Sequence, residues 1–265
     1  MRETNSSGKA SQATATPPIA IRGLTKTYKR GREEVAAVRD LDLEVQANEV
    51  FGFLGPNGAG KTTTVKCLLG LARPSTGRAS VLGHPAGSME ARKRLGYLPE
   101  NPYFYEYLTG LELLDWVGRV AGVNGADRLR RAGELLERVG MSHAARIQLR
   151  KYSRGMMQRI GLAQALMNDP ELLVFDEPMN GLDPIGRAMA KELIRELKTQ
   201  GKTVFFNTHI LSDVEELCDR VGIIVNAELK AAGPVAEVRR PGMNLEQTFV
   251  EVVNEAGPLR PEVAR

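Results

Sequence analysis

A glycine-rich stretch, residues 55–63, carries the residue types best suited to holding phosphate: Gly-Pro-Asn-Gly-Ala-Gly-Lys-Thr-Thr. Glycines let the backbone curl so that several N–H groups point at one anion. Lys61 adds a point charge for the β- and γ-phosphates, Thr62 offers a hydroxyl to Mg²⁺, and Thr63 could reach an α-phosphate. This spacing predicts a loop that binds the phosphates of a nucleotide.

The flanking sequence supplies the strand and the helix that such a loop needs. Residues 50–54 form an apolar run typical of a buried strand, and residues 62–71 are helix-like. A helix N-terminus would add partial positive charge at the phosphates. A chance glycine turn is the alternative, and the strand and helix on either side argue against it. The expected phosphate-binding residues are Gly55, Asn57, Gly58, Ala59, Gly60, Lys61, Thr62 and Thr63.

Two acidic residues, Asp176 and Glu177, follow the apolar run 172–175. Such a run is typical of a central parallel strand, and ligand sites lie at the carboxyl ends of these strands. Asp176 is expected to complete a Mg²⁺ site with the hydroxyl of Thr62. If the chain turns at the strand end, Glu177 faces the γ-phosphate as the general base for an attacking water. The alternative is a pair of solvated carboxylates without a role.

His209 and Tyr28 are further candidates for nucleotide contacts. His209 follows the apolar run 203–206, which places it at the same expected sheet edge, where it could sense the γ-phosphate. Tyr28 could stack on a purine ring. A structural histidine and a core tyrosine are the alternatives for these two positions.

The elements that must position these residues follow from hydrophobic periodicity. Residues 1–18 have almost no large apolar side chains, so we expect a disordered tail. Alternating patterns at 19–24 and 35–45 predict a small antiparallel sheet. Helical spacing dominates 101–169, which predicts a helical insert. The alternation of strands and helices that resumes after residue 170 predicts a mostly parallel sheet with helices on both faces.

Composition and charge restrict the class of protein. The 265 residues, 42% hydrophobic and 26% charged, are ordinary for a globular chain, and a net charge of +4 is too weak to indicate nucleic acid. Cys67 and Cys218 lie in apolar, helix-like contexts, which favours a reducing cytoplasm over a disulfide framework. We find neither an apolar run long enough to span a bilayer nor the apolar core of a secretory signal. Any membrane role would therefore require another chain.

From Ile19 onward the sequence resembles the nucleotide-binding subunits of ABC transporters. Residues 152–159, Tyr-Ser-Arg-Gly-Met-Met-Gln-Arg, are similar to the family signature Leu-Ser-Gly-Gly-Gln, with matches at Ser153 and Gly155. The stretch Gly-Leu-Asp ending at Asp183 matches the family's D-loop, and His209 its switch histidine. Together with the phosphate loop and Asp176-Glu177, these motifs are highly specific to the family.

The resemblance implies an α/β fold: a P-loop NTPase core with a mostly parallel sheet, an N-terminal antiparallel β subdomain and an inserted helical subdomain. The ATP core would comprise 19–100 and 170–228, the helical subdomain 101–169, and a strand/helix extension 229–265. The implied ligands are ATP and Mg²⁺. The resemblance does not imply a nucleic-acid partner. The implied partners are a second ATP-binding subunit and a separate transmembrane permease, with the export type most similar. The chain would then lie in the cytoplasm, peripheral on the inner face of the membrane.

The resemblance implies that Ser153 and Gly155 serve the nucleotide held by the second subunit, and that Asp183 of the D-loop is also a nucleotide-binding residue. One position departs from the family pattern, because Glu100 stands where the Q-loop usually has glutamine. A carboxylate still binds Mg²⁺ through oxygen, so the expected metal ligands are Thr62, Glu100 and Asp176.

Two other functions remain open from the sequence. A soluble ABC-type ATPase acting on DNA or ribosomes usually has two cassettes or a long coiled coil, whereas this chain has one phosphate loop and no sustained heptads. A regulatory ATP sensor would not turn over ATP, and the presence of Glu177 and His209 argues against it.

Overall fold

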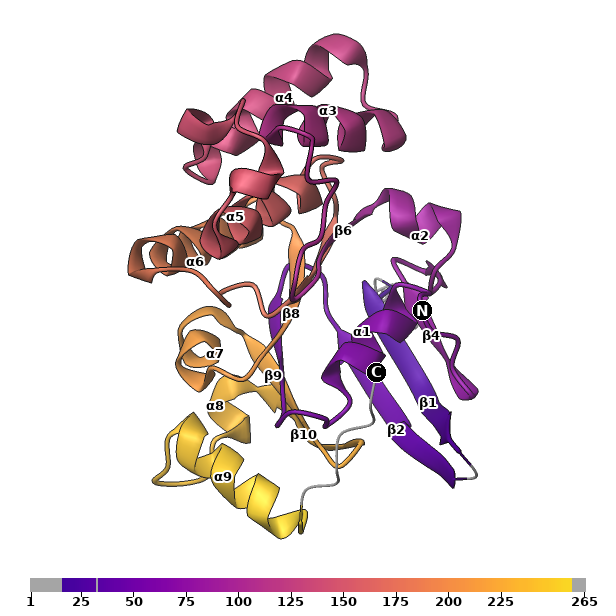
Figure 1. The fold of residues 1–265 in the computed structure, drawn as a ribbon. Helices are drawn as coiled ribbons and strands as arrows, with labels where there is room; N and C mark the ends of the chain where they lie inside the picture. Colours follow the sequence, from indigo (N-terminus) through magenta and orange to yellow (C-terminus); the bar gives the residue numbers. More distant parts are fainter. Residues whose placement is uncertain (1–15, 32, 259–265) are drawn as a thin grey trace, which may run out of the picture.

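Two β-sheets and the surrounding helices make up the structure, a computed structural model that describes residues 16–31 and 33–258 (Figure 1). Most of the tail expected at 1–18 lies outside the described residues. The strands are β1 (Ile19–Arg30), β2 (Glu33–Val45), β3 (Val50–Leu54), β4 (Thr76–Val81), β5 (His84–Pro85), β6 (Leu95–Leu98), β7 (Leu172–Asp176), β8 (Thr203–Thr208), β9 (Arg220–Val225) and β10 (Glu228–Pro234). The helices are α1 (Lys61–Leu68), α2 (Met89–Lys93), α3 (Gly110–Val120), α4 (Gly125–Arg138), α5 (Arg154–Ala165), α6 (Pro184–Thr199), α7 (Leu211–Leu217), α8 (Val235–Val238) and α9 (Leu245–Glu255), with 3₁₀ turns at Ser142–Ala144 and Leu149–Lys151.

The larger sheet has the strand order β10-β9-β3-β8-β7-β6, in which only the edge pair β10–β9 is antiparallel. Every residue of β3, β7 and β8 is buried, because both faces of the sheet are covered. Along β7, Leu173 and Phe175 pack into the core beneath α5 and α6, whereas Leu172 and Val174 pack into the core shared with α1 and the smaller sheet. The sheet therefore separates two apolar cores. Figure 1 shows α5, α6 and α7 on one side of it and α1 with the smaller sheet on the other.

The smaller sheet is antiparallel, with the order β2-β1-β4-β5. Its strand β1 extends to Arg30, beyond the end predicted at residue 24. Register shifts follow Ile21 and Leu24, and Gly23 adopts a positive φ of 54°. Bulges of this kind bend a strand without ending its pairing, and the interrupted alternation hid the second half of β1 from the pattern.

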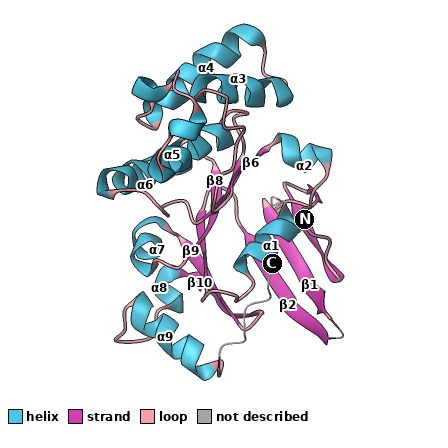
Figure 2. Cartoon of the chain, viewed as in Figure 1, coloured by secondary structure: helices cyan, strands magenta, loops and turns pink. Residues whose placement is uncertain are grey.

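The range 101–169 is built from α3, α4 and α5, in agreement with the helical spacing predicted there, and Figure 2 shows α3 and α4 at one end of the molecule. Thr109 and Glu112 form a capping box at the start of α3. Asn124 caps α4 and Ser153 caps α5 with their side chains. Among the described residues, no helix combines the length and the apolar character that crossing a bilayer requires.

The sequence pattern predicts a helix over residues 187–199, and α6 begins earlier, at Pro184. The side chain of Asp183 accepts a hydrogen bond from the N–H of Gly186, and Pro184 occupies the first helical position. Both residues are typical of a helix start. The short helix α2 was not predicted, because five residues are too few to establish a helical period.

Candidate nucleotide site

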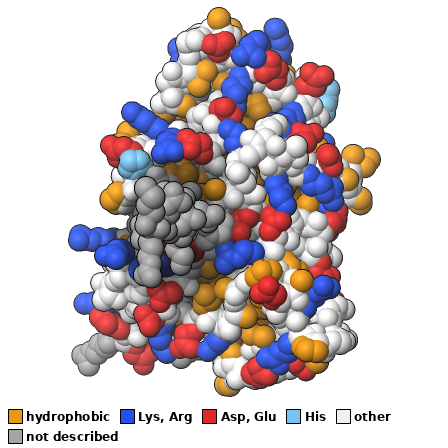
Figure 3. All heavy atoms as spheres, turned by 180° about the vertical axis from the view of Figure 1, so that it is seen from behind, with side chains coloured by type: hydrophobic (Ala, Val, Ile, Leu, Met, Phe, Trp, Pro, Cys, Tyr) orange, Lys and Arg blue, Asp and Glu red, His pale blue; other side chains and the backbone are white. Residues whose placement is uncertain are grey.

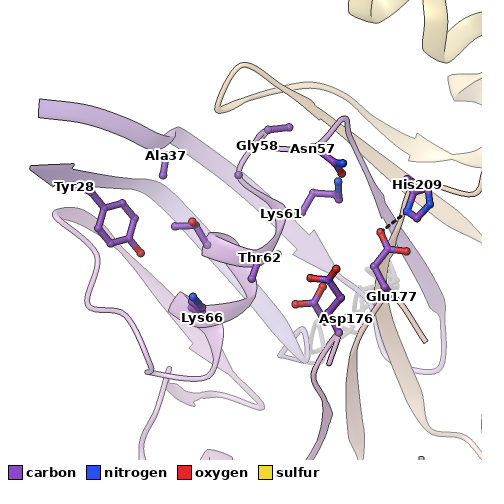
Figure 4. A pocket seen from close by; sticks show the side chains of 14 residues that line it. Tyr28, Ala37, Asn57, Gly58, Lys61, Thr62, Lys66, Asp176, Glu177 and His209 are labelled. Atoms are coloured by element: carbon purple, nitrogen blue, oxygen red, sulfur yellow. Dashed lines mark hydrogen bonds and ion pairs between the residues drawn. The ribbon is translucent and has the colours of Figure 1, made fainter. Parts of the chain in front are cut away.

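A pocket of about 600 Å³ opens at the carboxyl edge of the larger sheet, beside the smaller sheet. It brings together residues from β1, the glycine loop, α1 and the ends of β7 and β8. In Figure 4, Tyr28 lies at one end of the pocket and Glu177 with His209 at the other. The lining residues are Tyr28, Ala37, Asn57, Gly58, Ala59, Gly60, Lys61, Thr62, Thr63, Lys66, Glu100, Asp176, Glu177 and His209.

The glycine loop packs so closely that two of its glycines leave no room for a side chain. Gly60 has a φ of 115°, and a Cβ there would lie 2.3 Å from the carbonyl oxygen of Ala37. A Cβ at Gly55 would lie 2.3 Å from the carbonyl oxygen of Ile224. Helix α1 starts immediately after Gly60, so its N-terminus lies at the pocket. The loop thus has the backbone geometry of an anion site.

Lys61 is the first residue of α1 and is largely buried at the centre of this loop. Its Nζ donates hydrogen bonds to the carbonyl oxygens of Gly55 (2.5 Å) and Pro56 (3.1 Å). These contacts hold the ammonium group at the pocket, in the position where a phosphate would need a cation.

At the end of the pocket opposite Tyr28, the chain leaves the sheet at Glu177. Its φ of 53° ends strand β7, while its N–H still donates to the backbone oxygen (3.1 Å) and the Oδ1 (3.0 Å) of Asn207. A non-glycine residue in this left-handed region is strained, and such strain is concentrated at functional sites. The turn directs the carboxylate of Glu177 toward the pocket, as the sequence analysis required of a general base.

The carboxylate of Glu177 has two partners from the end of the neighbouring strand. The hydroxyl of Thr208 donates to Oε2 at 3.2 Å, and Nδ1 of His209 lies 2.8 Å from Oε1. The side chain of Glu177 is 9% exposed and that of His209 57% exposed. A carboxylate fixed by two contacts at the edge of the pocket is chemically able to accept a proton from a bound water.

The oxygen donors of the pocket fit a magnesium ion held jointly with a nucleotide. Thr62, Glu100 and Asp176 all line the pocket, and Asp176 is nearly inaccessible at the end of β7. Within residues 16–31 and 33–258 there is no group of three or more His, Cys, Asp or Glu side chains that could hold a metal unaided. Mg²⁺ in phosphate sites typically takes one or two carboxylates and completes its shell with phosphate oxygens and water, so the donor set suits it.

Three predicted site residues, Ser153, Gly155 and Asp183, do not line this pocket. Ser153 is exposed, and its Oγ accepts a hydrogen bond from the N–H of Met156 at the start of α5. A Cβ on Gly155 would lie 3.2 Å from the carbonyl oxygen of Gly181, just before Asp183. The start of α5 and the start of α6 therefore lie side by side at the surface.

Asp183 is held between these two helix starts. Its Oδ1 accepts hydrogen bonds from the N–H of Gly186 at 2.8 Å and from the Arg159 guanidinium at 3.0 Å. The Gly186 N–H and, after it, the Arg159 guanidinium lower the pKa of Asp183, which keeps the carboxylate charged. Asp183 therefore caps α6 and joins it to Arg159 of α5 in the absence of a ligand.

Three polar residues at the site were not predicted from the sequence. Lys66 lines the pocket one turn after Thr62, and helical spacing was the available signal for it. Asn207 and Gln158 contact the backbone of Glu177, and both are buried. A glutamine on the apolar face of α5 was a signal for Gln158, but its target could not be read from the pattern.

A protein-family model described as ABC transporter matches residues 38–180, more than half of the chain. This protein belongs to the ABC transporter family. The resemblance seen in its sequence motifs is confirmed, and so is the α/β fold with its antiparallel and helical parts.

Curated relatives of this ABC protein are described as ATP-binding proteins. An uncharacterized ABC transporter ATP-binding protein of Synechocystis is 50% identical over 220 residues, which are 81% of this chain and 62% of the relative. A fluoroquinolones export ATP-binding protein of Mycobacterium tuberculosis is 39% identical over 232 residues, 87% of this chain and 75% of the relative. The chain thus spans less than two thirds of the length of the Synechocystis protein.

Two solved structures show the same fold. The ATP-binding subunit of an ABC transporter superposes with a TM-score of 0.82 at 31% identity, covering 89% of this chain and 99% of the other. The dimeric structure of a bacterial ABC transporter cassette gives a TM-score of 0.76 at 25% identity, covering 82% and 98%. The described architecture is therefore that of an ABC ATP-binding cassette.

Proposed function

We propose that this protein binds ATP with Mg²⁺ in the pocket described above, hydrolyses it, and thereby drives export through a separate transmembrane permease. The observation that carries the proposal is the position of Glu177, fixed by His209 and Thr208 at the end of the pocket opposite Tyr28, with Lys61 between the two ends (Figure 4). A phosphate-binding loop alone would suit any nucleotide-binding protein. A constrained carboxylate facing that loop is what hydrolysis adds to binding.

In this mechanism each group has a separate task. Lys61 and the backbone N–H groups of the glycine loop bind the phosphates, and Tyr28 stacks on the purine. Glu177 accepts a proton from water as the water oxygen bonds to the γ-phosphorus, and the bond to the β,γ-bridging oxygen breaks to leave ADP. His209 keeps the carboxylate oriented and contacts the γ-phosphate.

The magnesium ion would be held by Thr62, Asp176 and Glu100. When bound, it neutralises charge on the phosphate oxygens. Glu100 replaces the amide usual in the family at this position with a carboxylate. The chain therefore presents an additional negative charge to the metal.

We propose that two chains assemble head to tail. The pocket is open, and Ser153, Gly155 and Asp183 lie outside it on an exposed surface at the starts of α5 and α6. A helix N-terminus is suited to bind an anion, and a second chain would bring this surface to the γ-phosphate. The dimeric bacterial cassette provides a precedent for such pairing.

The description of one relative supports export as the proposed direction of transport. The Mycobacterium tuberculosis relative is described as an export protein, and no helix of the described residues could cross a bilayer. The chain would then sit on the cytoplasmic, inner face of the membrane, bound to a permease. In this proposal the ATP core comprises 19–100 and 170–228, the helical subdomain 101–169, and the extension 229–265.

The surface charge gives little support to nucleic acid as the partner. On the face shown in Figure 3, basic and acidic side chains are interspersed over the described part of the surface. Across the described residues many charged side chains form ion pairs, as in Arg138 with Glu196 and Arg240 with Glu255. Proteins that bind nucleic acid generally gather positive charge on one face.

The proposed activity is tested by ATP turnover and nucleotide affinity of the purified protein. We expect turnover in the presence of Mg²⁺, and loss of both binding and turnover in Lys61→Ala, because the loop then lacks its cation. Lys93→Ala removes an exposed lysine from α2 and serves as the matched control. Wild-type affinity and turnover in Lys61→Ala would refute the phosphate-site assignment.

A further inference from the structure

Gln158 connects helix α5 to the backbone that carries Glu177. Its side chain is 2% exposed, and its Nε2 donates hydrogen bonds to the carbonyl oxygens of Glu177 (3.2 Å) and Pro178 (3.1 Å). The other large side chains on the buried face of this helix, such as Ile160 and Leu162, are apolar. A buried amide in that setting is costly unless it is paired, so its contact with this turn is a specific feature.

The turn itself needs these donors. Glu177 has left the strand with a positive φ, and Pro178 has no N–H to continue a ladder. The carbonyl oxygen of Glu177 also accepts the N–H of Asn180, and the Nε2 of Gln158 is the donor to Pro178. Removal of the Gln158 amide would therefore deprive the carbonyl oxygen of Pro178 of this hydrogen bond and destabilise a strained turn.

The next residue of α5 holds the other end of the same segment. Arg159 donates from its guanidinium to Oδ1 of Asp183 at 3.0 Å, and Asp183 caps α6. The segment 177–183 is thus attached to α5 at both ends by adjacent residues. A displacement of α5 would therefore move Glu177 and the start of α6 together.

Ser153 caps the N-terminus of α5, and the proposed dimer places this residue against the nucleotide of the second chain. From Ser153 to Gln158 the helix rises about 7.5 Å, a little over one turn, which is too short for appreciable bending. The helix could therefore act as a rigid connection between the two nucleotide sites. Helix α5 also packs directly in the core with the sheet that carries Glu177.

We propose that Gln158 is a positioning residue for Glu177 and that, with Arg159, it couples the nucleotide at the start of α5 to hydrolysis in the chain's own pocket. The inference rests on the head-to-tail dimer of the proposed function. Its consequence is that contact between the α5 N-terminus and the partner's nucleotide further restrains the turn that carries the base of the same chain. Hydrolysis of ATP at one site of the dimer would then depend on the nucleotide bound at the other.

The test is the steady-state ATPase of Gln158→Met, which keeps the volume of the side chain and removes its donors. We expect kcat to fall at least about tenfold with KM within about twofold of wild type, and the Hill coefficient for ATP to fall from above 1 to 1. Gln164→Met makes the same change more than one turn further along α5, where the glutamine is half-buried, and should behave as wild type. An unchanged kcat and Hill coefficient in Gln158→Met would overturn the inference.

A second measurement separates positioning from a general loss of structure. Gln158→Met combined with Glu177→Gln should still form ATP-dependent dimers, as expected of Glu177→Gln alone. Loss of those dimers in a double variant that is folded by circular dichroism would show that Gln158 supports assembly rather than the base, and would contradict the inference.

If Gln158→Met does not fold, Arg159→Met tests the coupling instead, because Arg159 holds the segment 177–183 at Asp183. We expect the same fall in kcat at unchanged KM, with recovery of at least half the activity in Arg159→Lys, which restores a cation for Asp183. Wild-type kcat in Arg159→Met would overturn the inference. A wild-type protein without any ATPase activity would instead refute the proposed function, so the two failures are distinguishable.

Discussion

Nδ1 of His209 lies 2.8 Å from Oε1 of Glu177, and the two residues follow the ends of adjacent parallel strands, β8 and β7. Asp176 pairs with Asn207 in the sheet. Glu177 comes one residue after Asp176 and His209 two residues after Asn207, so this pairing brings them close together. The relationship is therefore built into the sheet. It links the proposed base to the residue expected to contact the γ-phosphate.

Replacing this histidine should slow hydrolysis without preventing binding. We expect His209→Ala to lower kcat by about 10–10²-fold, because Glu177 loses one of its two fixed contacts while Lys61 and the loop are unchanged. His143→Ala, an exposed histidine in the 3₁₀ turn Ser142–Ala144, is the control. Turnover and ATP affinity should be measured for both; equal kcat in the two variants would remove His209 from the mechanism.

Two inactive chains should restore one site when mixed, if each pocket is completed by its partner. A dimer of a Lys61→Ala chain with a Ser153→Arg chain contains one site built only from intact halves. We expect ATPase activity above that of either variant alone, measured on mixed dimers isolated with two different tags. Mixed dimers without recovery would contradict independent, shared sites.

Asp213 joins α7, which follows His209, to α6. Its inaccessible carboxylate accepts hydrogen bonds from Arg187 (3.1 Å) and pairs with Lys191 (2.9 Å). Asp213→Ala should lower the free energy of unfolding by about 1–3 kcal/mol, since two cations lose a buried acceptor. Glu216→Ala, which also removes a partner of Lys191 but from an exposed position, should cost less than about 1 kcal/mol. Urea unfolding of both variants tests the order, and an equal loss would show that burial is not decisive here.

The two cysteines should react slowly in the native protein. The Sγ of Cys218 packs against the backbone of β3 at Gly52, and burial raises the pKa of the Cys218 thiol well above its usual value; burial also raises that of Cys67. A raised thiol pKa means less thiolate at a given pH, so at pH 8 labelling by a disulfide reagent should be at least about tenfold slower than in unfolded protein. Single-cysteine variants assign the rates. Rapid labelling of native protein at either cysteine would be inconsistent with this packing.

The strands that carry the site were predictable because they are buried on both faces. Strands β3, β7 and β8 read as continuous apolar runs, and the polar residues that end them could be placed at one sheet edge. Gly60 and Lys61 were predictable for a local reason, since their spacing is a property of one loop. These features depend on neighbours in sequence.

The remaining features depend on tertiary contacts that no local pattern encodes. The left-handed turn at Glu177 is stabilised by Gln158 from α5 and Asn207 from β8, which are distant in sequence. Strand β1 continues through Gly23 because it is paired on both sides, by β2 and β4. The early start of α6 is the exception, because the sequence Asp183-Pro184 already carries the signal of a capped helix.

The central claim is that Glu177 is the base of an ATPase whose two chains close on ATP. Glu177→Gln keeps the shape of the side chain and removes its charge, so ATP and Mg²⁺ should bind while hydrolysis falls by about 10²–10⁴-fold. The decisive measurement is size-exclusion chromatography of purified Glu177→Gln with ATP and Mg²⁺, with ADP and Mg²⁺, and without nucleotide, alongside its ATP turnover. We expect a dimer with ATP alone and a monomer in the other two conditions. Hydrolysis at the wild-type rate would contradict the role of Glu177, and an inactive variant that stays monomeric with saturating ATP would contradict closure of two chains on the nucleotide.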